Sequence, residues 1–111
     1  MPVPFQGRSL TNVAVAQVAP ASLDLASAPG AGLRIHVVSI VLIANGAGTL
    51  KFQENAVTDL TGPISLAANG GMVVIADGVN PILSTLTPNL KLNLVTATSF
   101  VNGWIRYFID A

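Results

Sequence analysis

The stretch from Leu33 to Glu54, LRIHVVSIVLIANGAGTLKFQE, carries the clearest structural pattern of the chain. Its first half is dominated by Val, Ile and Leu, which favour β-strands. Its second half alternates, so that Leu50 and Phe52 share one face and polar residues share the other. The NGAG between the two halves is typical of a turn. We therefore predict two β-strands, at 33–44 and 48–54, joined by a short turn.

The same alternation of short apolar runs and turn signals extends over the rest of the chain. The Gly and Pro residues recur at roughly ten-residue intervals, the spacing of strands in a β-sandwich or barrel. No window offers a capped helix of useful length. We predict an all-β domain at 10–111 that follows an N-terminal arm at 1–9. Its strands are expected near 10–19, 22–26, 33–44, 48–54, 64–68, 72–76, 82–86, 90–96 and 100–109.

The first long strand is apolar on both of its faces over part of its length. It starts with a polar face, where Arg34 and His36 alternate with apolar residues. From Val38 through Ile40 and Leu42 both faces are apolar, and such a strand must be covered on both sides. A sandwich of 111 residues has a single core, so we predict that another subunit covers the second face.

The last strand, FVNGWIRYFI, has one aliphatic and one aromatic face. We assign the aliphatic face to the sandwich core. Aromatic residues and Arg are the types enriched at interface centres, so we predict a contact surface that contains Phe100, Trp104 and Arg106. The alternative is that Trp104 and Phe108 pack under a loop or under the arm of the same chain.

Composition excludes several classes of partner. Five basic and five acidic residues balance, and charged residues make up 9% of the chain, against roughly 25% in typical domains. There is no basic stripe to bind nucleic acid, no apolar run of the ~20 residues that a membrane helix needs, and no secretory signal. We expect a soluble protein made in the cytoplasm, whose surplus apolar surface is covered by copies of itself or by a larger assembly.

Residues that could carry out catalysis are few and scattered. His36 is the single histidine, and its nearest serine, Ser39, falls on the opposite face of the strand. The five carboxylates are far apart in sequence, there is no cysteine, and no metal or nucleotide motif is present. We predict no enzymatic activity, no cofactor and no metal. A sugar site on Trp104 is disfavoured, because Tyr107 falls on the other face.

Three segments together resemble a β-sandwich module of tailed-bacteriophage virion proteins. They are LRIHVVSIVLIANGAGTLKFQ, DLTGPISLAANGGMVV and LKLNLVTATSFVNGWIRYFID, and they span roughly Leu33 to Ile109. The shared pattern is a long apolar strand, a short Gly turn, a KF strand, LTGPI.LAANGG and a final NG.I.Y strand. The module occurs in small head decoration (cement) proteins and in related fibre and tail domains. It offers no catalytic residues to carry over, and residues 1–32 lie outside the resemblance.

The resemblance implies a single antiparallel β-sandwich that is jelly-roll-like, with about eight strands, and that assembles as a homotrimer. It implies binding to the major capsid protein lattice on the virion exterior, after synthesis in the bacterial host cytoplasm. The alternative function is a receptor- or carbohydrate-binding domain of a tail or fibre.

The N-terminal arm is predicted to contribute to attachment. Its prolines and glycine oppose regular structure, so it could become ordered on the capsid and reach across neighbouring subunits. Phe5 and Arg8 are its predicted anchors. The alternative is a terminus that has no binding role.

Overall fold

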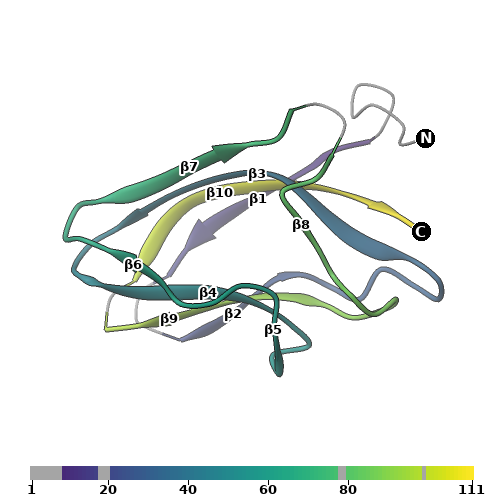
Figure 1. The fold of residues 1–111 in the computed structure, drawn as a ribbon, viewed down its shortest axis with the longest axis horizontal. Helices are drawn as coiled ribbons and strands as arrows, with labels where there is room; N and C mark the ends of the chain where they lie inside the picture. Colours follow the sequence, from purple (N-terminus) through teal and green to yellow (C-terminus); the bar gives the residue numbers. More distant parts are fainter. Residues whose placement is uncertain (1–8, 18–20, 78–79, 99) are drawn as a thin grey trace.

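The computed structural model describes residues 9–17, 21–77, 80–98 and 100–111, which form an all-β molecule (Figure 1). Within these ranges no helix is long and apolar enough to cross a membrane. The predicted arm at 1–9 lies outside the described residues except for Ser9. The roles assigned to Phe5 and Arg8 therefore stay predictions.

The strands form two antiparallel sheets that pack face to face (Figure 1). Sheet A has the order β1-β10-β3-β7, with β8 also paired to β3, and sheet B has the order β2-β9-β4-β5, with β6 also paired to β4. Sheet A contains β1 (Thr11–Ala16), β3 (Arg34–Ala44), β7 (Gly71–Ile75), β8 (Leu83–Ser84) and β10 (Val101–Asp110). Sheet B contains β2 (Ser22–Ala26), β4 (Gly48–Glu54), β5 (Thr58–Asp59), β6 (Ile64–Leu66) and β9 (Leu92–Ala97).

Each of the strands predicted from the sequence is present, with boundaries that differ by a few residues. The additional strand is β5, which pairs with the end of β4 at Gln53 and Glu54. Two residues are too few to show an alternating pattern, so the sequence offers no signal for it.

The strand pairing is that of one long hairpin that has been rolled up. β1 pairs with β10, β2 with β9, β3 with β7 and β8, and β4 with β5 and β6, so each pair is nested inside the one before it along the chain. Rolling adds the pairs β10–β3 and β4–β9, which complete the sheets. β5 and β6 both pair with β4, so they count as one interrupted strand, and β7 and β8 count as another because both pair with β3. With this count the fold is the predicted jelly-roll-like sandwich of eight strands.

The core lies between the two sheets and is built from alternate residues of the strands. In β4, for example, Leu50 and Phe52 are fully buried, whereas Lys51 between them is half-exposed. Burial of each large side chain stabilises the fold by roughly 1.5–3 kcal/mol. The buried cluster consists of Val15, Leu25, Ala26, Ile35, Val37, Ile40, Leu42, Ala44, Leu50, Phe52, Leu92, Leu94, Val101 and Ile105.

A β-bulge in β3 explains its two-faced apolar sequence. In the pairing with β10, Arg106 lies opposite Ser39 and Tyr107 lies opposite Val37, so Val38 is left without an opposite residue. An extra residue of this kind reverses which side of a strand faces the core. The even-numbered residues face outward before the bulge and inward after it.

The bulge corrects the inference that a second subunit must cover Ile40 and Leu42. Both side chains face the sandwich core, where they are 1% and 0% exposed. Their own chain therefore covers them. The outward residues of this part of β3 are Val41, which is half-buried, and Ile43, which is exposed.

Gly103 allows β10 and β3 to approach closely at the centre of sheet A. Its φ of +147° is rarely adopted by residues with a side chain, and a Cβ atom there would collide with the carbonyl oxygen of Val41. Glycine is therefore required at this position in the NGW segment of the last strand.

Candidate functional site: the outer face of sheet A

The outer face of sheet A, which points away from the core, carries a row of apolar side chains. The strand register places Ala14, Trp104, Val41 and Val73 opposite one another across β1, β10, β3 and β7. Each strand has at least one neighbouring residue that packs into the core, so these four side chains point outward; these neighbours are Val13, Val15, Ile40, Leu42, Met72 and Ile105. Trp104 and Val41 are half-buried, and Val73 is 68% exposed.

Two neighbouring rows widen this surface. One row contains Ala16, Asn102, Ile43 and Gly71, and the other contains Asn12, Arg106, Ser39 and Ile75. Ile43 and Ile75 are 57% and 69% exposed. We refer to the apolar members of the three rows as the apolar band: Ala14, Ala16, Val41, Ile43, Val73, Ile75 and Trp104.

Arg106 is held at the border of the apolar band by two contacts. Its guanidinium carbon lies 5.5 Å from the centroid of the Trp104 ring, a cation–π distance. Its Nε donates a hydrogen bond to Oδ1 of Asn12 at 2.7 Å. Both predicted contact residues of β10 therefore lie on the outer face, where Arg106 contacts the Trp104 ring and Asn12.

The remaining predicted contact residues among those described lie outside the apolar band. Val38 is 3% exposed and packs with Phe108 and Ala76 in a small second cluster. Phe100 is half-buried just before β10, where its N–H donates to Oδ1 of Asn45. Phe108 thus follows the alternative interpretation, packing within the chain, whereas Trp104 stays partly accessible on the outer face.

The outer face of sheet B is polar. Nζ of Lys51 lies 3.1 Å from Oδ1 of Asp59, which also accepts a hydrogen bond of 2.7 Å from Gln53. Lys91 and Asp24 form a second ion pair at 3.3 Å. The hydrogen bond from Gln53, followed by that from Lys51, holds the pKa of Asp59 below its ordinary value of 3.8. Paired, hydrated groups of this kind suit a face exposed to water.

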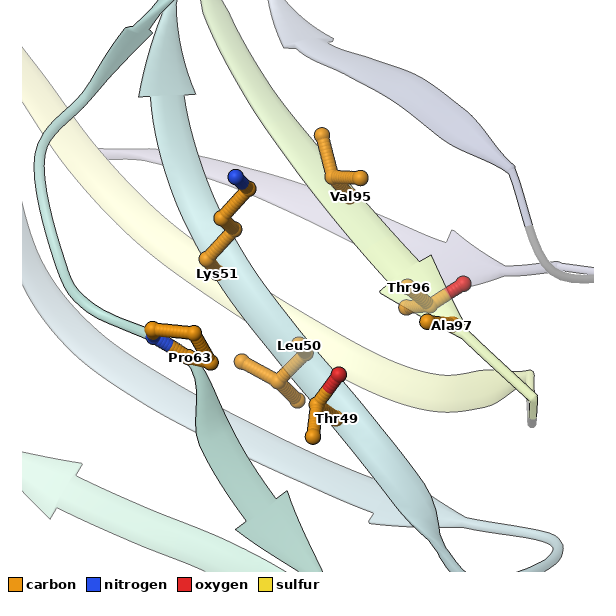
Figure 2. A pocket seen from close by; sticks show the side chains of 7 residues that line it. All are labelled: Thr49, Leu50, Lys51, Pro63, Val95, Thr96 and Ala97. Carbon is orange, nitrogen blue, oxygen red and sulfur yellow. The ribbon is translucent and has the colours of Figure 1, made fainter.

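A hollow of about 310 Å³ lies on the outer face of sheet B (Figure 2). Pro63 lies on one side of β4 and the β9 side chains lie on the other. The lining residues are Thr49, Leu50, Lys51, Pro63, Val95, Thr96 and Ala97. Lys51 is the one charged residue among them, and it is paired with Asp59. The lining thus holds threonine hydroxyls without a base to activate them.

A second hollow, of about 450 Å³, adjoins the apolar band at the end of β3. Its polar lining comes from Asn45, Asn69 and Asn102, and its apolar lining includes Ile43. Amide side chains both donate and accept hydrogen bonds. This combination could hold a neutral, hydroxyl-rich ligand. The sequence did not predict the group, because the three asparagines come from two different turns and a strand.

The fold also brings together a histidine and a serine that sequence reasoning did not pair. Nδ1 of His36 lies 2.7 Å from Oγ of Ser84, which is opposite it in β8. The His36 ring stacks on Phe108 with centroids 4.9 Å apart. Only the nearby Ser39 was considered from the sequence, since long-range strand pairing gives no local signal. These contacts tie β10, β3 and β8 together across the outer face.

Glu54 is the most buried carboxylate of the described residues, at 3% exposure. Its Oε1 accepts hydrogen bonds from the backbone N–H groups of Leu86 at 2.7 Å and Thr87 at 3.2 Å. It therefore positions the loop that follows β8. In the part of the chain that the structure describes, no group of three or more His, Cys, Asp or Glu side chains could hold a metal ion.

Comparisons with known proteins give no further assignment. A scan against protein-family models, a search of curated proteins and a search of solved structures each found no significant match. The resemblance to bacteriophage decoration proteins stays a prediction.

Proposed function

We propose that this chain is a non-enzymatic structural protein that assembles as a homotrimer and decorates the head of a bacteriophage virion. The observation that supports this proposal is the apolar band, in which Ile43, Val73 and Ile75 are each more than half exposed. Contiguous exposed apolar surface is typical of an interaction site. The band contains Trp104 and has Arg106 at its border, and both are residue types enriched at interface centres.

The contrast between the two outer faces suggests an orientation. The ion pairs of sheet B, Lys51 with Asp59 and Lys91 with Asp24, keep that face compatible with water. The apolar band has no such groups, so neighbouring copies or the capsid lattice cover it. A trimer then attaches through several equivalent contacts at once, and this multivalency turns modest contacts into firm attachment.

The first test is the oligomeric state of the purified chain. We expect light scattering at micromolar concentration to give three times the chain mass of 11.4 kDa. A stable monomer at all concentrations would reject the self-association on which the proposal depends.

The second test is the location of the protein in the particle. A decoration protein is expected in many copies on purified heads, whereas a tip protein is expected in few copies on the tail. A variant that lacks residues 1–9, compared with the full chain on the same capsids, measures what the arm contributes. If the occupancy is unchanged, the arm has no part in attachment.

The second hollow favours one other function, a carbohydrate-binding domain of a tail or fibre. The amides of Asn69 and Asn102 beside Ile43 resemble the mixture of hydrogen-bonding and apolar groups that binds small polar ligands. Tyr107 gives this function no support, because it packs against the core. A glycan array with the wild-type chain and with Asn102→Ala decides the matter: a specific signal that the substitution removes favours this function.

A further inference from the structure

Among the described residues, the two edges of sheet A lack the usual protection against pairing with another strand. One edge is β1, with the sequence TNVAVA, and the other is β7, with the sequence GMVVI, which is continued along β3 by the two-residue strand β8. Natural edge strands commonly carry charged residues or proline, which discourage such pairing, and neither of these strands has any. By contrast, the β2 edge of sheet B carries Asp24 in the middle of the strand.

Hydrogen bonds to β3 show which backbone groups of β7 are open. The N–H of Ala76 donates to the carbonyl oxygen of Val38 at 2.9 Å, in line with the register of the pair. In an antiparallel pair alternate residues point their N–H and C=O groups to the same side. The backbone N–H and C=O groups of Gly71, Val73 and Ile75 therefore point away from β3, toward the free edge.

The same reasoning applies to β1. The N–H of Gln17 donates to the carbonyl oxygen of Val101 at 3.2 Å, which extends the register of β1 with β10. The odd-numbered residues of β1 thus face β10. The N–H and C=O groups of Asn12, Ala14 and Ala16 point toward the free edge.

The two free edges match in direction and in spacing. Because every neighbouring pair from β1 to β7 is antiparallel, β1 and β7 run in opposite directions. A second copy that continues the sheet therefore brings its β1 antiparallel to β7 of the first. The open groups then meet in three pairs, in which Ile75, Val73 and Gly71 lie opposite Asn12, Ala14 and Ala16 of the next copy.

We propose that β7 of one copy pairs with β1 of the next, and that this head-to-tail junction builds the assembly. The inference deepens the proposed function, because it rests on self-association and names the strands that carry it. The junction places the larger side chain of Val73 beside the small side chain of Ala14 and joins the apolar bands of adjacent copies into one surface. Head-to-tail contacts of this kind close into a ring when the rotation from one copy to the next closes, and a homotrimer requires such a closed ring.

Two proline substitutions test the junction. Val73→Pro and Ala14→Pro each remove an N–H that points to a free edge, and proline is tolerated in edge strands at such positions. We expect each variant to keep the wild-type circular dichroism spectrum and to run as a monomer in light scattering. Val73→Thr and Ala14→Ser keep the N–H and are expected to assemble as the wild type does.

Mixing the two proline variants distinguishes the head-to-tail junction from a symmetric one. Each variant retains one intact edge, so an equimolar mixture should form a heterodimer of twice the 11.4 kDa chain mass. A contact between two β7 strands would instead leave Ala14→Pro able to pair with itself. Self-pairing of Ala14→Pro, or a mixture that stays monomeric, overturns the junction.

The outcomes also separate this inference from the proposed function. If the wild type is a monomer, self-association itself is rejected. If the wild type assembles and both folded proline variants assemble equally well, only the β7–β1 junction is rejected. Should a proline variant fail to fold, amide hydrogen exchange of the assembled wild type replaces it. Protection of the Val73 and Ala14 amides supports the junction, and rapid exchange of both overturns it.

Discussion

The outer faces of the two sheets have the same geometry and opposite chemistry. On sheet B, ionic and amide side chains pair across the strands, as Lys51 does with Asp59. On sheet A, the corresponding positions hold Val41, Val73 and Trp104, and the nearest charged group, Arg106, lies at the border over the indole ring. A sheet with one polar face can leave that face in water, whereas a sheet with two apolar faces is normally packed against other structure on both sides. The outer face of sheet A is therefore the face on which we propose contacts with other molecules.

The largest expected effect is a difference in unfolding free energy between two neighbouring residues of β3, one that faces the core and one that faces outward. Leu42→Ala removes a fully buried side chain and is expected to lower the free energy of unfolding by about 2–5 kcal/mol. Ile43→Ala, one residue further on, removes a side chain that is 57% exposed and should cost far less. Urea denaturation of both variants checks this. Equal losses would mean that Ile43 is covered to the same extent as Leu42.

Glu54 tests whether the buried carboxyl group at the end of β4 stabilises the fold. Glu54→Ala leaves the N–H groups of Leu86 and Thr87 without their acceptor, so we expect a loss of about 1–3 kcal/mol of unfolding free energy. Thermal unfolding measures it. Assembly should be unchanged, because the residue points away from the apolar band. A loss of assembly with normal stability would show that sheet B also makes contacts between copies.

A matched pair of valines compares the outer faces directly. Val41 and Val95 are both half-buried at the middle of their outer faces, on sheet A and sheet B respectively. We expect Val41→Lys to raise the dissociation constant for purified capsids at least tenfold, because a charge would have to be desolvated in the contact with the lattice. Val95→Lys should leave this constant unchanged. Co-sedimentation with the capsids measures both, and the reverse result would move the contact surface to sheet B.

The smallest expected effect concerns the pH dependence of the polar face. The pKa of Asp59 is lowered in the folded chain, first by the hydrogen bond from Gln53 and then by that from Lys51. Its contribution to stability is therefore fully present above the ordinary value of 3.8 and is lost as the pH falls through the lower folded value. As the pH falls below 3.8, the urea concentration at the midpoint of unfolding should decrease less for Asp59→Asn than for the wild type. Parallel curves would contradict the shift.

The strands and the sandwich could be predicted from the sequence because alternation is a local signal. Leu50 and Phe52 point inward as their pattern indicates, and Trp104 and Arg106 share the outer face as the parity of the last strand predicts. The β-bulge at Val38 could not be predicted in the same way. A single unpaired residue leaves no compositional mark, so the alternation read straight through it predicts the wrong face for Ile40.

The remaining features of the site depend on pairing between distant strands. Val73 joins Trp104 and Val41 only because β7 lies beside β3. In the same way, Ser84 meets His36 only because β8 does. The sequence shows that each strand exists, but the order of strands in a sheet is set by the global packing of the sandwich. For this reason the apolar band was outside the reach of sequence reasoning.

The position of β10 has a consequence for how the protein is made. The last strand lies in the interior of sheet A, between β1 and β3, so both of these strands lack their central neighbour until residues 101–110 have left the ribosome. Contacts between the two ends of a chain make folding slow. During that interval the nascent chain presents unpaired strand edges that are prone to aggregation.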